Sequence, residues 1–289
     1  MMGLWRYSFP RYVRGCLLAS CRFLEMCMSF DVYPHAQDQM GELISQISDS
    51  VLEFYGNMSN ATVVGWKKTD LAPIIILSEP PFSMQLAAYS FCPKWAKEYP
   101  VKWSSYNARL ERVNQKTHKA EKIYQVATWK EAFRNSQFCA VPMSSAHESC
   151  HFGRNAGEIV KFFPKSQPAF YALGIWEIWL NQLTQQPVRT FALLTDGPYP
   201  YWFQTGHDRG LVVIDEKKLE TTVLQIKKSQ AQSQEDLLDY IREIRIDLPW
   251  KHQSIRKLKK IHSPSQSELR EIETTIFKGS TRGGAKSNS

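Results

Sequence analysis

The run Ala169-Phe-Tyr-Ala-Leu-Gly-Ile-Trp-Glu-Ile-Trp179 gives the clearest structural signal in the chain. Its aromatic and β-branched residues predict a β-strand. Two more apolar runs follow at residues 190–195 and 211–214, and the Gly197-Pro198 turn lies between them. Such turn residues separate strands because they bend the backbone sharply. The second half of the chain is therefore expected to contribute several strands to one sheet.

Helical and strand signals are interspersed along the rest of the chain. Shorter strands are expected at 73–77 and 85–92. Thr128 with Glu131 predicts a capped helix through Phe133, and Ser233 with Asp236 predicts another. The first helix is expected over 38–56, where apolar residues recur at helical spacing: Met40, Leu43, Ile44, Ile47, Val51 and Phe54. Because no βαβ rhythm is present, the sequence predicts a single α+β domain.

Charge and length narrow the range of partners. The chain has 289 residues, a net charge of +8 and a pI near 9.1. A basic protein of this kind favours polyanionic partners, and nucleic acid is the first expectation. No stretch approaches the roughly 20 apolar residues of a membrane span, so no membrane partner is expected.

The two ends of the chain differ in composition from its middle. We expect residues 1–25 to be a leader that is either removed or lies before the true start, a folded domain over 26–250, and a basic then polar tail at 251–289 that is disordered. The six cysteines show no close C-x-x-C spacing. Together with the lack of a clear secretion signal, this predicts free thiols and a cytoplasmic location.

Glu148 lies in His147-Glu148-Ser149-Cys150-His151, which spells the H-E-x-x-H pattern of zinc peptidases. That pattern binds zinc only on a helix, where both imidazoles share one face. Serines and a nearby glycine surround this copy and make a poor helix. We therefore expect no metal here, although a zinc peptidase built on His147 and His151 stays open as an alternative.

Cys27 suggests a different chemistry for Glu148. When a cysteine is at the true N-terminus, its α-amine and thiol together can condense with an aldehyde to form a thiazolidine ring. The amine has an ordinary pKa of about 7.7 to 8.0, so much of it is nucleophilic near neutral pH. Imine formation also needs proton transfer, for which a carboxylate and an imidazole are suited.

Several segments spread over residues 26 to 250 resemble the SOS-response-associated peptidase (SRAP) family, which processes abasic sites. They appear in the family's order: Met26-Cys27-Met28-Ser29-Phe30, Pro93-Lys94-Trp95-Ala96, Asn107-Ala108-Arg109, Phe138 through Ser149, Gly174-Ile175-Trp176-Glu177 and His207-Asp208-Arg209. The gapless alignment of the fourth segment places the family's glutamate at Glu148. The match is incomplete, since Met28-Ser29 stands where the family has Gly-Arg and Ser145-Ala146-His147-Glu148-Ser149 stands for Gly-Phe-Tyr-Glu-Trp.

The resemblance implies a fold, an activity and a set of site residues. The fold would be a β-rich pseudo-barrel of mostly antiparallel strands flanked by a few helices. Cys27 would link covalently to abasic sites in single-stranded DNA after autoproteolytic exposure. Asn107, Glu148 and His207 would be its catalytic partners, in a monomer without cofactor that associates with the nucleoid during DNA damage. The expected DNA contacts are Arg109, Arg209, Trp95, Tyr89 and Thr195.

One more alternative remains. A chain that kept the fold and the basic surface but lost the covalent chemistry would be a single-stranded DNA-binding module. Trp95 and Tyr89 would then serve as stacking platforms for bases.

Overall fold

The computed structural model describes residues 29–258, apart from 41–42, 58–61, 68, 79 and 115, together with residues 269–270 and 274. Five strands form a closed ring in which neighbouring strands pair: β4 (Leu71–Ile76), β5 (Phe82–Ala88), β12 (Pro187–Asp196), β11 (Phe170–Leu180) and β9 (Phe138–Ser149). All pairs in the ring are antiparallel except β12 with β5. The predicted α+β class and pseudo-barrel core are confirmed.

Shorter strands extend this ring on several sides. On one side β9 pairs with β1 (Ser29–Val32), which in turn pairs with β3 (Thr62–Val64). Beyond the bend of β9 lie β10 (Glu158–Pro164) and then β15 (Trp250–Lys257). The remaining strands are β2 (Ile44–Ile47), β6 (Asn107–Arg109), β13 (Gly210–Leu211) and β14 (Val213–Ile214), with a separate hairpin of β7 (Glu111–Val113) and β8 (Ala120–Lys122).

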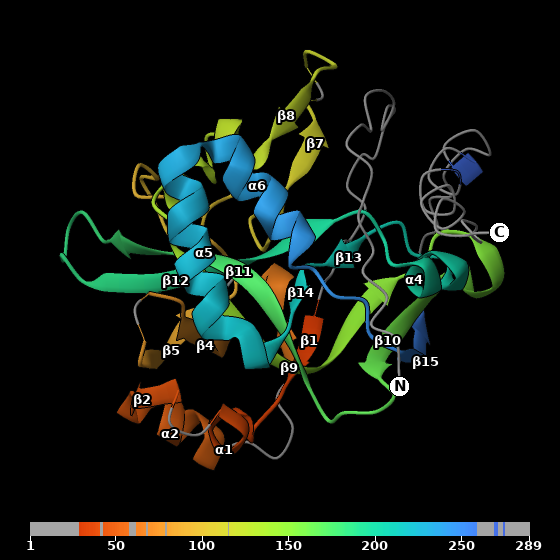
Figure 1. Cartoon of the computed structure of the whole chain (residues 1–289), viewed down its shortest axis with the longest axis horizontal. Coiled ribbons are helices and arrows are strands. Elements are labelled where there is room, and N and C mark those ends of the chain that lie inside the picture. Colours follow the sequence, from red (N-terminus) through yellow and green to blue (C-terminus); the bar gives the residue numbers. More distant parts are fainter. Residues whose placement is uncertain are drawn as a thin grey trace, which may run out of the picture.

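The helices lie around the outside of the ring, as Figure 1 shows. Residues of α5 (Leu219–Gln232) and α6 (Gln234–Glu243) share a buried apolar cluster with β11 and β12. The short helix α4 (Pro200–Thr205) covers β10, where Trp202 stacks on Phe162 with ring centroids 4.4 Å apart. The other helices are α1 (Ala36–Met40), α2 (Asp49–Gly56) and α3 (Lys130–Arg134).

Both faces of the ring strands are buried. Tyr171 and Leu173 belong to the cluster beneath α5 and α6, whereas Phe170 and Ala172 belong to a second cluster with Trp202 and Trp250. A strand buried on both faces has a nearly continuous apolar sequence. This explains why the run at 169–179 lacks polar alternation.

A β-bulge in β9 decides which side chains face the second cluster. Asp31 pairs with Ser145 but Val32 pairs with Met143, so Ser144 is an extra residue. Before the bulge the odd-numbered residues up to Met143 face the second cluster, and after it the even-numbered Ala146 does. Because side chains alternate along a strand, Glu148 shares the face of Ala146.

Several local expectations need correction. The helix predicted over 38–56 is two helices with strand β2 between them, because residues 44–47 pair in parallel with β5. The predicted Thr128 capping box does not form, since α3 begins after Trp129. The predicted tail begins too early, because residues up to Lys257 form β15. The strand at 211–214 is divided into β13 and β14.

One other local expectation is confirmed. The predicted cap of α6 is present, and Ser233 Oγ accepts a hydrogen bond of 3.0 Å from the Asp236 backbone N–H. No helix among the described residues is both long enough and apolar enough to cross a membrane.

Candidate functional site

A histidine–carboxylate pair is buried at the end of β9. His207 Nε2 lies 3.2 Å from Glu148 Oε2, and each side chain is only 2% exposed. His207 Nδ1 lies 2.8 Å from the Ser149 carbonyl oxygen, to which it donates a hydrogen bond. Because a carbonyl oxygen can only accept, Nδ1 carries a proton, and Nε2 faces the carboxyl group at a distance short enough for proton exchange. The pair can therefore hold and transfer one proton.

Burial also sets the charge of His207. It lowers the pKa of the imidazole to about 4, and the attraction of nearby Asp208 only partly offsets this effect. The imidazole is therefore uncharged at neutral pH. A neutral histidine held against a buried carboxyl group is the arrangement expected of a proton-transfer site.

The end of α4 fixes the position of His207. Gly206 terminates the helix in a left-handed conformation with φ +115°. A Cβ atom at Gly206 would lie 2.1 Å from the Phe152 carbonyl oxygen, so only glycine fits. The backbone N–H groups of Gly206 and His207 both donate to the Trp202 carbonyl, at 3.1 and 3.0 Å. The helix end thus directs the His207 ring toward β9.

Charged groups surround the pair. Burial by itself raises the pKa of the Asp208 carboxyl. The neighbouring Arg209, His207 and Arg109 outweigh burial and hold that pKa well below its usual range. Arg209 Nε lies 3.4 Å from Asp208 Oδ1, and the arginine is only 7% exposed. The site therefore combines the buried Arg209 and the half-buried Arg109 with the carboxylate of Asp208.

Strand β6 supplies two of the predicted residues. It runs parallel to β12, with Asn107 opposite Leu193 and Arg109 opposite Thr195. Thr195 also pairs with Leu211 in β13, which follows the His207-Asp208-Arg209 segment. The structure therefore places Arg109 and Thr195 in neighbouring strands, and Arg209 immediately before β13, which pairs with the end of β12.

The predicted stacking role of Tyr89 is wrong. Tyr89 is fully buried, with its ring 5.1 Å from that of Phe191 and 5.2 Å from that of Phe30. Its hydroxyl donates a 3.1 Å hydrogen bond to Asn107 Oδ1. Tyr89 is thus a core residue that orients the Asn107 amide, and no base can reach its ring.

Trp95, in contrast, is on the surface, and it has a partner that the sequence analysis missed. It is 52% exposed and stacks on Trp103, which is 39% exposed. The two ring centroids lie 5.6 Å apart at an interplanar angle of 14°. Exposed aromatic rings of this kind suit base stacking. Trp103 could have been noticed as one of the nine tryptophans, but nothing near it in the sequence marks it as exposed.

The zinc alternative fails on secondary structure. His147, Glu148 and Ser149 lie in strand β9, so His147 and His151 do not share a helix face. In addition, the described residues contain no group of three or more metal-binding side chains. Cys27 lies outside the described residues, so its predicted role stays a prediction.

A second polar cluster, also missed in the sequence, lies on the opposite face of β9. Asp31 accepts hydrogen bonds from Lys161 Nζ at 2.6 Å, Ser145 Oγ at 2.7 Å and Thr62 Oγ1 at 2.6 Å. His147 Nε2 lies 3.3 Å from the same carboxylate, and His147 Nδ1 lies 3.0 Å from Ser29 Oγ. In this cluster both oxygens of the Asp31 carboxylate and both ring nitrogens of His147 have polar partners.

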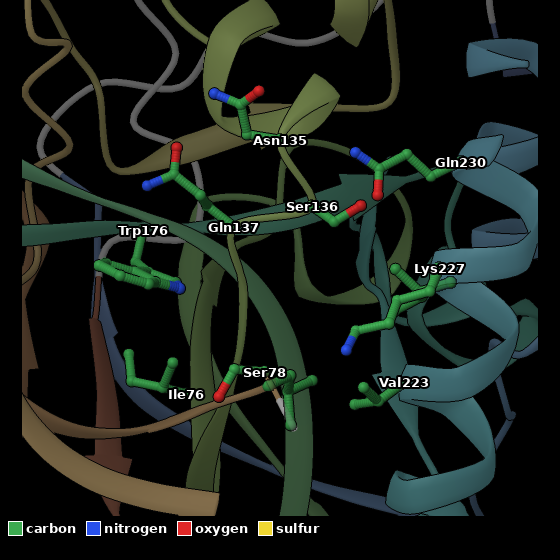
Figure 2. Close-up of a pocket in the computed structure, with 11 residues that line it drawn as sticks. Ile76, Ser78, Asn135, Ser136, Gln137, Trp176, Val223, Lys227 and Gln230 are labelled. Carbon is green, nitrogen blue, oxygen red and sulfur yellow. The ribbon is translucent and has the colours of Figure 1, made fainter. Parts of the chain in front are cut away.

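A cavity of about 490 Å³ lies at the other end of β9, away from these residues. Figure 2 shows Trp176, Lys227 and Gln230 among the side chains around it. None of the predicted site residues lines this cavity.

Comparison with known proteins gives the site its context. The sequence model described as "SOS response associated peptidase (SRAP)" matches residues 58–251. This chain belongs to the SRAP family. The match includes Asn107, Glu148 and His207 and begins after Cys27. The family's description ties this SRAP protein to the SOS response, and so to DNA damage.

Solved structures agree with the fold of the SRAP protein. A crystal structure of a protein from Bacteroides thetaiotaomicron has 19% sequence identity and a TM-score of 0.61, covering 80% of this chain and 92% of its own. A second, from Bordetella bronchiseptica, has 14% identity and a TM-score of 0.56, covering 80% of this chain and 100% of its own. No curated protein matches the sequence.

Proposed function

We propose that this SRAP protein forms a covalent link to abasic sites in single-stranded DNA through Cys27, once Cys27 has become the N-terminal residue. The observation that carries the proposal is the buried Glu148–His207 pair, which can transfer a proton in a site that also holds the buried Arg209 and the half-buried Arg109. Burying a titratable carboxyl group costs stability, and buried titratable pairs of this kind gather at functional sites.

The chain geometry supports a meeting between Cys27 and this pair. Ser29 lies opposite His147 in the β1–β9 ladder, and His147 precedes Glu148. Two residues of chain span at most about 7 Å between Cα atoms. This reach is long enough for Cys27 to approach the end of β9 that carries Glu148.

The chemistry uses one proton donor and one acceptor. The Cys27 amine adds to the aldehyde carbon of the ring-opened abasic sugar. The adduct then loses water, with Glu148 donating a proton to the departing hydroxyl group, and leaves an imine. The thiol next adds to the imine carbon, forming a C–S bond, and its proton ends on the ring nitrogen. His207 holds and returns the proton that Glu148 exchanges.

Exposure of the amine is the necessary first step. The Met26–Cys27 peptide bond must be hydrolysed, or residues 1–26 must otherwise be absent, because an acylated nitrogen cannot form the imine. Hydrolysis consumes one water and leaves a carboxylate on Met26. We assign this cleavage to the same site, with Cys27 as the nucleophile.

The surrounding residues suit a DNA substrate. Arg109 and Arg209 can hold phosphate groups through paired N–H donors, and Thr195 lies beside Arg109 in the sheet. The Trp95–Trp103 stack offers a surface for neighbouring bases. A net charge of +8 favours the approach of a polyanion.

The test is adduct formation with a single-stranded oligonucleotide that contains one abasic site. We expect a species that survives boiling in detergent and high salt, and an intact mass that starts at Cys27. A Cys27→Ala protein should give no adduct, and Cys21→Ala should behave as the wild type. An adduct formed by Cys27→Ala would refute the proposal. Salt-sensitive binding without any adduct would instead identify a binding module.

A further inference from the structure

Strand β15 is an edge strand with an unusual surface. It pairs with β10 and with no other strand among those the structure describes. Only its first residue, Trp250, is buried, and the seven that follow are all exposed. Nearly all of β15 lies beyond residue 251, where the match to the SRAP family ends.

The strand lies close to the predicted catalytic residues. Glu148 in β9 is opposite Val160 in β10, and Val160 is opposite Ser254 in β15. These three residues form one row across the sheet. Neighbouring strands are about 4.8 Å apart, so Ser254 is about 10 Å from Glu148. A single strand held at Glu148 would therefore reach β15 within a few nucleotides.

Four exposed residues of β15 are basic or become so on protonation: Lys251, His252, Arg256 and Lys257. None of its exposed residues is acidic. His252 and Lys257 lie opposite Phe162 and Glu158, on the face that carries Glu148. Lys251 and Arg256 lie on the other face, so cations project from both sides of the edge.

An aromatic side chain lies next to this edge. Tyr201 in α4 has its hydroxyl 2.8 Å from His252 Nδ1. Lys165, at the end of β10, holds its ammonium group 6.0 Å from the centre of the Tyr201 ring. The surface beside the site therefore places several cations next to an aromatic ring, with one carboxylate, Glu158, opposite Lys257. Cations beside an aromatic ring are features of single-strand binding surfaces.

We propose that β15 binds the phosphate backbone of the single-stranded DNA a few nucleotides from the abasic site. The inference rests on the proposed function, because it takes the strand to be the substrate held at Glu148. Lys251, Arg256 and Lys257 contact phosphates, and the open edge of β15 offers backbone N–H groups as further donors. These contacts are independent of sequence and position the lesion without taking part in the reaction.

The basic residues of β15 have an alternative explanation, because lysines on an edge strand prevent it from pairing with the edge of another sheet. The two roles differ in a measurable way. Protection of the edge affects aggregation and leaves the salt dependence of DNA binding unchanged. Each phosphate contact, in contrast, adds about 0.7 to the slope of log affinity against log salt for single strands.

The experiment measures this slope in the full chain. Cys27→Ala serves as the background, so that only reversible binding to an undamaged single strand is observed. We compare the triple variant Lys251→Gln, Arg256→Gln, Lys257→Gln with the matched triple variant Lys217→Gln, Lys227→Gln, Lys228→Gln. Both lose three positive charges from exposed positions, and the second set lies on and just before α5. Thermal unfolding checks that both variants fold.

The expected result is a slope lower by about 2 for the β15 triple variant, from three contacts of about 0.7 each, and an unchanged slope for the control. Equal slopes for the two variants would overturn the proposal, whether both fall or neither does. In the same Cys27→Ala background, but with strands that carry one abasic site, trimming the DNA on one side of that site should abolish the difference, and trimming the other side should not. If neither trimming changes the difference in slope, β15 does not contact the DNA on either side of the abasic site.

Failure of this inference differs from failure of the proposed function. Adduct formation by the wild-type chain on a five-nucleotide strand centred on the abasic site depends on Cys27 and Glu148 and only weakly on β15. An adduct there with unchanged slopes would refute the β15 contact alone. Absence of an adduct, with the slope reduced as expected, would refute the covalent chemistry and leave β15 as a binding edge.

Discussion

Strand β9 carries two histidine–carboxylate pairs on opposite faces, built from neighbouring residues. On the outer face His147 lies 3.3 Å from Asp31, and on the inner face Glu148 lies 3.2 Å from His207. The outer carboxylate is 22% exposed and accepts hydrogen bonds from Lys161 and from two hydroxyl groups. In the inner pair, the side chains of Glu148 and His207 are each 2% exposed.

Environment separates the two pairs more than distance does. Burial works to raise the pKa of Asp31, but the hydrogen bonds from His147, Lys161, Thr62 and Ser145 outweigh it and hold that pKa far below its usual range. Asp31 is thus a permanently charged anchor. At the inner pair burial dominates and lowers the pKa of His207 to about 4. We therefore propose that the same two functional groups serve structure on one face and proton transfer on the other.

The sharpest way to break this comparison is to remove the inner carboxyl group. Glu148→Gln keeps the size of the side chain and removes its proton exchange. We expect the rate of adduct formation to fall by about 10² to 10⁴, the usual contribution of general acid–base catalysis. Single-turnover kinetics on abasic single-stranded DNA measures it. A rate within a factor of three of the wild type would remove Glu148 from the mechanism.

The second prediction concerns pH and His207. Its pKa is about 6.5 in the unfolded chain and about 4 in the folded one, so the unfolded chain binds more protons between these values. Stability contributed by the neutral ring is therefore complete above pH 6.5 and declines as the pH falls to 4, by on the order of 2–3 kcal/mol. His207→Gln should flatten this part of the curve. Chemical denaturation across the window tests it, and an identical slope in the variant would contradict it.

The third prediction addresses the outer face. Asp31→Ala removes the acceptor shared by Lys161, His147 and two hydroxyl groups, and we expect a loss of about 2 kcal/mol of unfolding free energy. The folded pKa of Asp31 is lowered, so its contribution is present above the ordinary value of 3.8 and is lost as the pH falls below it. Asp31→Asn should show less acid sensitivity than the wild type. Unfolding curves at pH 7 and pH 3 measure both effects.

The smallest expected effect comes from the outer histidine. His147→Gln retains hydrogen-bonding groups and should cost about 1 kcal/mol of stability, with the adduct rate within about threefold of the wild type. The same rate assay measured with Glu148→Gln supplies the contrast. If His147→Gln slowed the reaction as strongly as Glu148→Gln, the assignment of the two faces would be wrong.

The sequence predicted the elements whose signals are local. The aromatic run became β11, the run at 190–195 lies within β12, and Ser233 caps α6 as expected. Where pairing partners decided the outcome, local signals failed. Residues 44–47 have helical spacing but join β5 as a strand, and the polar, basic β15 is a strand only because β10 is beside it. Neither partner is adjacent in the chain.

By itself, the sequence determined which chemical groups are present and their order along the chain: Asn107, Glu148 and His207, within the region that matches the SRAP family. The tertiary structure decided which of two neighbouring residues serves the site. Side chains alternate along a strand, so the extra residue Ser144 turns every later side chain of β9 to the opposite face. That bulge directs Glu148 to His207 and His147 to Asp31, and it appears in the pairing of β9 with β1, a strand more than 100 residues away in the chain.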